Sequence, residues 1–196
     1  MPLPPTASFV AFDCDHFTVR ASRFALLSRK FRFYDEMGSL IACVKLIDYR
    51  VLSNIDVLDD SGRRTILRIC ERVPRWPVTY DLFDATTGNK IGSLQHRPWK
   101  SLFLEEWLIL DPDDHQIGRL HQRSMLIAFL HHFLIVVPIK YDFYLGDQLV
   151  GMCRQNANPL MPKISFEFHS EHARNLDRRF AVPAAILLLE NRKLEE

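Results

Sequence analysis

One phrase recurs along the chain: an apolar run, an acidic residue, a glycine and a second apolar run. Its clearest copy spans residues 79–94 and reads TYDLFDATTGNKIGSL. Aspartate and glycine tolerate the left-handed dihedral angles that a tight reversal needs, so each copy predicts one β-hairpin. The predicted hairpins span residues 30–44, 55–69, 79–94, 107–120 and 141–151.

Hairpins that follow one another with almost no helical pattern between them describe an antiparallel meander. The strict alternation of apolar and polar residues from Lys163 to His169 adds one late strand. A long meander leaves exposed edges unless it closes or stacks. The sequence therefore predicts a mainly β protein whose sheet closes on itself.

The C-terminal stretch from Phe180 to Leu189 contains only apolar residues and one proline. A helix that is apolar on all sides is buried on all sides, and this one is shorter than the roughly 20 residues that span a bilayer. Residues 175–179 supply an N-cap candidate. Because proline fits the first helical turn, Pro183 predicts either that the regular helix begins between Arg179 and Val182 or that it is kinked there. A buried strand or a membrane-dipping segment is the alternative.

A helix of about 12 residues is a rod of about 18 Å, close to the length of one strand. A closed sheet of about eight strands is filled by its own side chains, so a sheet of more strands leaves room on its axis. We therefore expect the C-terminal helix to occupy the axis of the barrel.

Residues 124–138 interrupt the strand pattern. Ser124 is a candidate cap for a short helix from Met125 to Phe133 that ends before Pro138. A strand is almost as compatible with the same residues, because Leu134 to Val137 have strong β propensity. Both alternatives stay open.

The size and composition fit a single globular domain. The chain has 196 residues, 47% of them hydrophobic and 25% charged, and a formal net charge of +1, which argues against a dedicated nucleic-acid-binding protein. Its start, MPLPP, lacks the features of a secretory signal, and its four cysteines form no CxxC pair. We expect a flexible tail at residues 1–8 and one domain at residues 9–196 in a cytoplasmic protein with reduced thiols.

The repeated Tyr-Asp and Gly-x-x-Ile-Gly phrases, such as Tyr80-Asp81 and residues 88–92, precede an acidic-basic-basic-apolar segment at residues 177–181 and an apolar helix. In this order they resemble the LURP-one-related or YxjI-like family, which belongs to one superfamily with the Tubby C-terminal domain and the phospholipid scramblases. The resemblance covers about residues 24–189. It implies a twelve-stranded antiparallel barrel around a central C-terminal helix.

The same resemblance implies a binding role and no catalytic residues. Tubby domains bind phosphoinositides, and calcium-dependent lipid movement is proposed for the scramblases. This chain lacks the acidic calcium-binding pattern of the scramblases and their type of cysteine cluster. It also departs from the family at residues 124–138 and at Pro183.

Arginines and lysines occur in clusters along the chain, and arginine suits phosphate because its planar fork forms paired hydrogen bonds. The residues chosen for an anionic headgroup are Arg97 and Lys100 beside Trp99, together with Arg174, Arg178 and Arg179 at the start of the helix. The alternative is that these clusters are solvated barrel surface with acidic neighbours.

Metal and catalytic sites are disfavoured. Adjacent His131 and His132 do not share a face of a helix or strand, and His169 and His172 have no acidic or cysteine partner at metal-ligand spacing. Neighbours in sequence, as in Asp13-Cys14-Asp15-His16, rarely form a nucleophile and base. No GxSxG, P-loop or GxGxxG motif is present. We expect no cofactor, no metal and no enzyme activity.

The sequence favours a non-enzymatic binding module that engages an anionic phospholipid or membrane surface, with cytoplasmic localisation and peripheral attachment to the inner face of the membrane. The alternative is a protein-interaction scaffold that uses the barrel exterior or the 124–138 insertion. A small-ligand carrier or enzyme that uses the barrel mouth is the third hypothesis, and it requires space inside the barrel.

Overall fold

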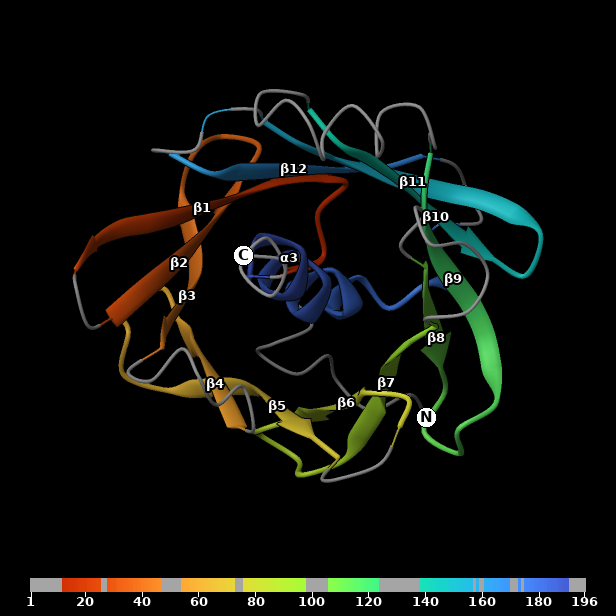
Figure 1. Ribbon diagram of the computed structural model, residues 1–196. Helices are drawn as coiled ribbons and strands as arrows, with labels where there is room; N and C mark the ends of the chain where they lie inside the picture. The colour runs from red at the N-terminus through yellow and green to blue at the C-terminus, as the bar shows by residue number, and fades with distance from the viewer. Residues whose placement is uncertain are drawn as a thin grey trace.

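Antiparallel strands form a closed ring around one helix in the computed structural model (Figure 1). The structure describes residues 12–25, 28–46, 54–72, 76–97, 106–123, 138–156, 158, 161–169, 173 and 175–190. The twelve strands are β1 (His16–Ala25), β2 (Ser28–Asp35), β3 (Leu40–Leu46), β4 (Asn54–Asp59), β5 (Thr65–Glu71), β6 (Thr79–Asp84), β7 (Lys90–His96), β8 (Glu106–Leu110), β9 (Gln116–Gln122), β10 (Lys140–Leu145), β11 (Gln148–Gln155) and β12 (Lys163–Phe168). Each strand pairs with its neighbours in sequence, and β1 pairs with β12, which closes the barrel.

All five predicted hairpins are confirmed, as β2–β3, β4–β5, β6–β7, β8–β9 and β10–β11. Gly38, Gly62, Gly88 and Gly146 have positive φ at four of the reversals, as the repeat predicted. The β8–β9 turn differs, because Asp114 takes the positive φ there and Gly118 lies within β9.

In four of the five hairpins an aspartate at the end of the first strand accepts hydrogen bonds from the backbone N–H groups of the turn. In the β6–β7 hairpin a carboxylate oxygen of Asp84 accepts hydrogen bonds from the backbone N–H groups of Thr86 and Thr87. Asp111 does the same for Asp113 and His115 in the β8–β9 turn. These bonds satisfy backbone donors that a tight turn leaves free, so the repeat specifies the turns first of all.

Alternation along each strand sorts side chains between the interior and the solvent. Phe17 and Val19 on β1 are buried, as are Phe31 and Phe33 on β2. Arg20, which follows Val19 on β1, points the other way and is exposed. The inward side chains form a single hydrophobic core with the helix. The expected fold class, a mainly β closed barrel of twelve strands around a buried C-terminal helix, is confirmed.

The axial helix α3 (Ala181–Glu190) follows a single 3₁₀ turn, η2 (Arg178–Phe180). Asp177 caps η2 by accepting a hydrogen bond from the backbone N–H of Arg179, and Pro183 lies in the first turn of α3. Every residue from Ala181 to Leu189 is buried, and Figure 1 shows α3 enclosed by the strands. The membrane-dipping alternative is wrong for these residues.

The barrel wall approaches the start of the helix closely at Gly92 on β7. A Cβ atom at this position would lie 2.5 Å from the ring of Phe180 and 2.2 Å from the backbone oxygen of Leu110. Only glycine fits this site, so the second glycine of the Gly-x-x-Ile-Gly phrase serves packing against the helix.

Strand β1 was not identified from the residue pattern, although its inward Phe17 and Val19 alternate with outward residues. The tail at residues 1–8 and the insertion at residues 124–137 lie outside the described residues, and Pro138 is half-buried. Among the helices that are described, none is both long enough and apolar enough to cross a membrane.

Candidate functional site

The two ends of the barrel differ in charge. The five tight turns, the start of β1 and η2 lie at one end, here called the hairpin end. It carries the turn aspartates and Asp13, Asp15 and Asp177. The opposite end is where β5, β7 and β9 finish and β10 and β12 begin, and arginines and lysines predominate among its described residues.

Arg178 and Arg179, which were chosen as headgroup ligands, lie at the hairpin end and are already engaged. Arg178 donates to Asp15 at 2.6 Å and to Asp13 at 3.3 Å, with its guanidinium 5.7 Å from the ring centre of Phe168.

Arg179 donates to Asp84 at 2.7 Å and to Asp177 at 2.6 Å. The side chains of Arg178 and Arg179 are only 13% and 12% exposed. Their positive charge is offset by carboxylates, so both arginines fasten the start of the helix to the barrel wall and to the segment before β1.

Arg97, the third chosen residue, lies at the opposite end, directly after β7. Its guanidinium is 3.7 Å from the carboxylate of Glu106, which is buried at the start of β8. Lys100, Trp99 and Arg174 lie outside the described residues. The structure therefore brings Arg178 and Arg179 together at one end and places Arg97 at the other.

Arg97 belongs to a series of arginines on one side of the barrel, each paired with a carboxylate on a neighbouring strand. Arg72, after β5, forms two hydrogen bonds with Asp81, at 2.6 and 2.7 Å. Arg123, after β9, donates to Asp142 at 2.9 Å. We call Arg72, Arg97 and Arg123 with their three carboxylates the paired side.

The Arg72 pair belongs to a larger network on the outer face of β5, β6 and β7. The hydroxyl of Ser93 donates to Asp81 at 2.7 Å, and Lys90 and Asp114 extend the network. Burial alone would raise the pKa of Asp81, but hydrogen bonds from Arg72 and Ser93 outweigh it and hold that pKa below its usual value.

On the outer faces of β1, β2 and β10–β12, cations lie opposite one another, and the carboxylates of β10 and β12, Asp142 and Glu167, lie in a separate row on either side of Met152. Arg32 on β2 lies opposite Arg20 on β1, and Arg20 lies opposite Lys163 on β12. In the next row Lys140 on β10 lies opposite Arg154 on β11. Lys30 lies two residues before Arg32 and so shares its face of β2. We call this set of six outward-facing cations the basic face: Arg20, Lys30, Arg32, Lys140, Arg154 and Lys163.

None of these six side chains forms an ion pair with a carboxylate among the residues that the structure describes. All six are exposed or half-buried. The guanidinium of Arg20 lies 4.9 Å from the ring centre of Tyr34, which orients it without neutralising it.

Between the charges are hydroxyl groups that can also contact an anion. Thr18 and Ser165 occupy neighbouring positions on β1 and β12, with their hydroxyl oxygens 3.5 Å apart. Ser165 lies opposite Arg154 on β11, so hydroxyls and cations share the same rows. The cations and hydroxyls of such a surface can donate hydrogen bonds to several phosphate or carboxylate oxygens at once.

Sequence reasoning missed most of the basic face. None of its six cations was among the residues chosen for an anionic headgroup. The signal was present, since each of these residues alternates with a buried apolar residue and so faces outward. Which outward residues become neighbours depends on strand order and register, and these are properties of the closed barrel.

Other groups that suggested chemistry have structural explanations. Burial is the main cause that raises the pKa of the Cys14 thiol to about 11, which disfavours the nucleophilic thiolate at neutral pH. Ligand atoms of Asp111, Asp113 and His115 lie within 4.8 Å of one another, but one oxygen of Asp111 already caps the turn. His169 is exposed and faces Glu167 at 3.5 Å, while His131, His132 and His172 lie outside the described residues.

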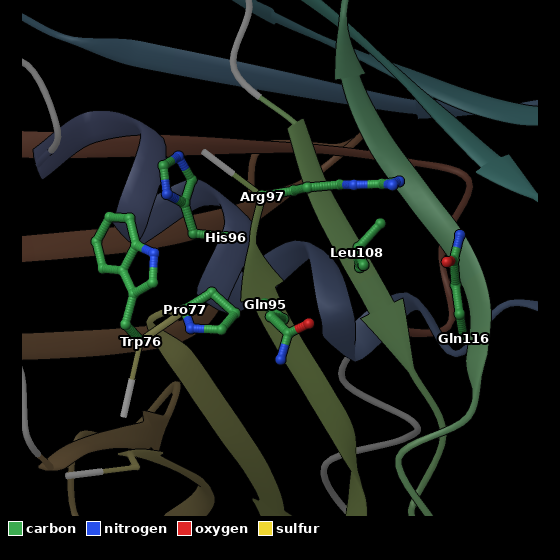
Figure 2. Close-up of a pocket in the computed structure, with 7 residues that line it drawn as sticks. All are labelled: Trp76, Pro77, Gln95, His96, Arg97, Leu108 and Gln116. Atoms are coloured by element: carbon green, nitrogen blue, oxygen red, sulfur yellow. The ribbon is translucent and has the colours of Figure 1, made fainter. Parts of the chain in front are cut away.

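An open hollow lies on the outer face of β7–β9, with a volume of about 390 Å³ (Figure 2). It is lined by Trp76, Pro77, Gln95, His96, Arg97, Leu108 and Gln116. Figure 2 shows Arg97 extended across β8. Among the described residues that line the hollow, Arg97 is the one arginine or lysine, and it faces Glu106, so these residues offer less to an anion than the basic face does.

A twelve-stranded antiparallel barrel with an apolar helix on its axis fits a Tubby-like fold, as the sequence resemblance implied. The chain is similar to a protein from Arabidopsis thaliana whose X-ray structure is known, with a TM-score of 0.54 and 12% sequence identity. The likeness covers 96% of this chain and 98% of that chain, and at this identity it shows the fold alone. No family model and no curated protein matches the sequence.

Proposed function

We propose that the protein is a non-enzymatic binding module that docks on anionic phospholipid surfaces through the basic face. The observation that carries the proposal is the set of six outward cations on five adjacent strands, with no paired carboxylate in the described part of the chain. On the paired side an acidic neighbour offsets the charge of each arginine. A basic patch left without such neighbours has positive potential available for a partner.

The energetics favour a role in binding over a role in stability. Like charges directly opposite each other on a sheet are destabilising, by roughly 0.2–1 kcal/mol per pair. Each Lys or Arg close to an anionic membrane contributes about 1 kcal/mol of attraction, so six of them suffice for reversible attachment. The positive potential thus weakens the free barrel and strengthens its complex with an anionic surface.

We further propose that the chain is a member of the LURP-one-related or YxjI-like family, acting in the cytoplasm and at the inner face of the membrane. The fold, the repeat and the terminal helix support this placement. The anionic lipids of that leaflet provide the surface that the basic face would meet.

A protein-interaction scaffold is the second candidate, because the same basic face would attract an acidic protein surface. The 124–138 insertion, its other suggested docking element, lies outside the described residues except for Pro138. Inside the barrel the described side chains of α3 are packed against the wall, which removes support for a carrier that uses the axis.

Co-sedimentation with vesicles tests the proposal. The protein should pellet with vesicles that contain phosphatidylserine or a phosphoinositide at low salt, should be released as salt rises, and should remain in the supernatant with pure phosphatidylcholine. Absence of binding to both kinds of anionic vesicle at low salt would refute the membrane role and leave the scaffold as the favoured function.

A further inference from the structure

One exposed apolar side chain adjoins the basic face. Met161 lies in the connection between β11 and β12, two residues before Lys163, and is 64% exposed. A single exposed methionine is ordinary on a protein surface. Met161 differs from an ordinary exposed methionine because it lies beside the basic face.

The turn that carries Met161 is held in place by side-chain and backbone hydrogen bonds. The side-chain amide of Asn156 donates to the backbone oxygen of Met161 at 2.9 Å and accepts from the backbone N–H of Lys163 at 2.8 Å. The backbone N–H of Met161 donates to the side-chain oxygen of Asn158 at 3.3 Å. These three bonds hold the backbone of Met161 and of Lys163 to Asn156 and Asn158.

The turn is also fastened to the strand at the centre of the basic face. The backbone N–H of Ala21 on β1 donates to the backbone oxygen of Pro162 at 3.0 Å. Ala21 follows Arg20, which lies opposite both Arg32 and Lys163. A surface that contacts these cations therefore approaches Met161 as well.

We infer that Met161 is a hydrophobic anchor that enters the headgroup region of an anionic bilayer while the basic face lies against the lipid phosphates. The inference rests on the proposed function and extends it, because an apolar anchor gains only from a partner with an apolar interior. A bilayer has such an interior beneath its charges, whereas a soluble polyanion does not. The flexible, unbranched methionine side chain adapts readily to such a surface.

Met37 is a matched control. It is 88% exposed in the β2–β3 turn, at the hairpin end and away from the basic face. Both residues can be compared in the unmodified protein, because dilute peroxide converts exposed methionine to its sulfoxide and mass spectrometry reads each site separately. Phosphatidylglycerol vesicles should slow the oxidation of Met161 severalfold and leave the oxidation of Met37 unchanged.

Substitutions provide the second measurement. Met161→Ser should weaken binding to these vesicles roughly five- to tenfold, since burial of a methionine side chain is lost, while Met161→Leu and Met37→Ser should bind like the wild type. None of these variants should change the affinity for heparin, a polyanion with no apolar interior.

The outcomes separate the two claims. If the protein binds the vesicles but Met161 oxidises as fast as in solution and Met161→Ser binds normally, the anchor is refuted and the proposed membrane role stands. Equal weakening of heparin and vesicle binding by Met161→Ser would also refute the anchor. If no anionic vesicle is bound at all, both claims fall.

Discussion

The paired side and the basic face are built on the same sheet from the same residue types, yet they differ in what the neighbouring strand supplies. Opposite Arg72, Arg97 and Arg123 the sheet supplies Asp81, Glu106 and Asp142. Directly opposite the members of the basic face it supplies serine, cysteine or another cation. Arginine is therefore a binding candidate only where the strands beside it leave its charge unmatched.

The start of the helix gives the same lesson. Arg178 and Arg179 are adjacent in sequence and precede a helix, as a phosphate site would require. Their partners Asp13, Asp15 and Asp84 come from distant parts of the chain and occupy both guanidinium groups. The two arginines can be found from their positions in the sequence. Their role in stabilising the protein follows from the carboxylates that the fold brings to them.

The largest expected effect concerns the helix that both sides of the barrel enclose. Ile186→Asp places a charge at a fully buried position on α3, and Leu187→Asp does the same at a position that is 3% exposed. An unpaired buried charge costs several kcal/mol, enough to unfold a domain of this size. Circular dichroism should show loss of cooperative unfolding; a folded, soluble variant would show that the helix is not central.

The next effect tests the basic face directly. The triple variant Arg20→Gln, Arg32→Gln, Lys163→Gln should bind anionic vesicles roughly 100-fold more weakly, because each cation contributes about 1 kcal/mol near the membrane. The control is Arg63→Gln with Arg64→Gln, two exposed arginines in the β4–β5 turn at the hairpin end. Vesicle titration should show little change in this control, and equal losses in both variants would remove the distinction between the two regions.

The paired side should respond in stability. Arg72→Met leaves Asp81, whose side chain is 15% exposed, without its main partner, and should lower the free energy of unfolding by about 1–3 kcal/mol. Denaturant unfolding measures the change, and vesicle affinity should not fall. A variant as stable as the wild type would contradict the role assigned to the pair.

The same variant has a pH signature. The pKa of Asp81 is lowered in the folded protein, so its contribution to stability is present above the unfolded pKa of about 3.9 and is lost as pH falls through the folded value. The wild type should therefore lose stability below about pH 4 more steeply than Arg72→Met. Parallel unfolding curves for the two proteins between pH 5 and pH 2 would contradict this assignment.

The smallest effect has the opposite sign. Arg20 lies opposite both Arg32 and Lys163, so Arg20→Gln relieves repulsion and should stabilise the protein by roughly 0.2–1 kcal/mol while it weakens vesicle binding. Residues kept for function at a cost in stability commonly behave in this way. A thermal melt compared with Arg72→Met should show shifts in opposite directions, and a loss of stability in both would argue that Arg20 serves the fold.

Local patterns were sufficient to predict most of the fold. The Asp and Gly residues of the repeat mark the reversals, and the apolar stretch from Phe180 to Leu189 marks the axial helix, because both signals depend on nearby residues only. The strand count came from the family resemblance. Strand β1 was not recognised, because its alternation of Phe17 and Val19 with polar residues is short.

The candidate site depended on contacts that span the whole chain. Arg20 and Lys163 become neighbours because the first and last strands pair to close the barrel. Arg179 loses its availability because Asp84 on β6 reaches it across the barrel end. Whether a cation has a carboxylate beside it therefore depends on strand order and register. Clusters of residues in the sequence do not reveal either.

Chemical footprinting of lysines can show which side of the barrel meets the membrane. Acetylation rates are measured by mass spectrometry with and without phosphatidylglycerol vesicles, which carry no competing amine. Lys30, Lys140 and Lys163 on the basic face should be protected severalfold, while Lys90, which lies in the network of Asp81 and Asp114 on the paired side, should react at an unchanged rate. Equal protection of all four lysines, or protection of Lys90 alone, would contradict the assignment of the membrane surface to the basic face.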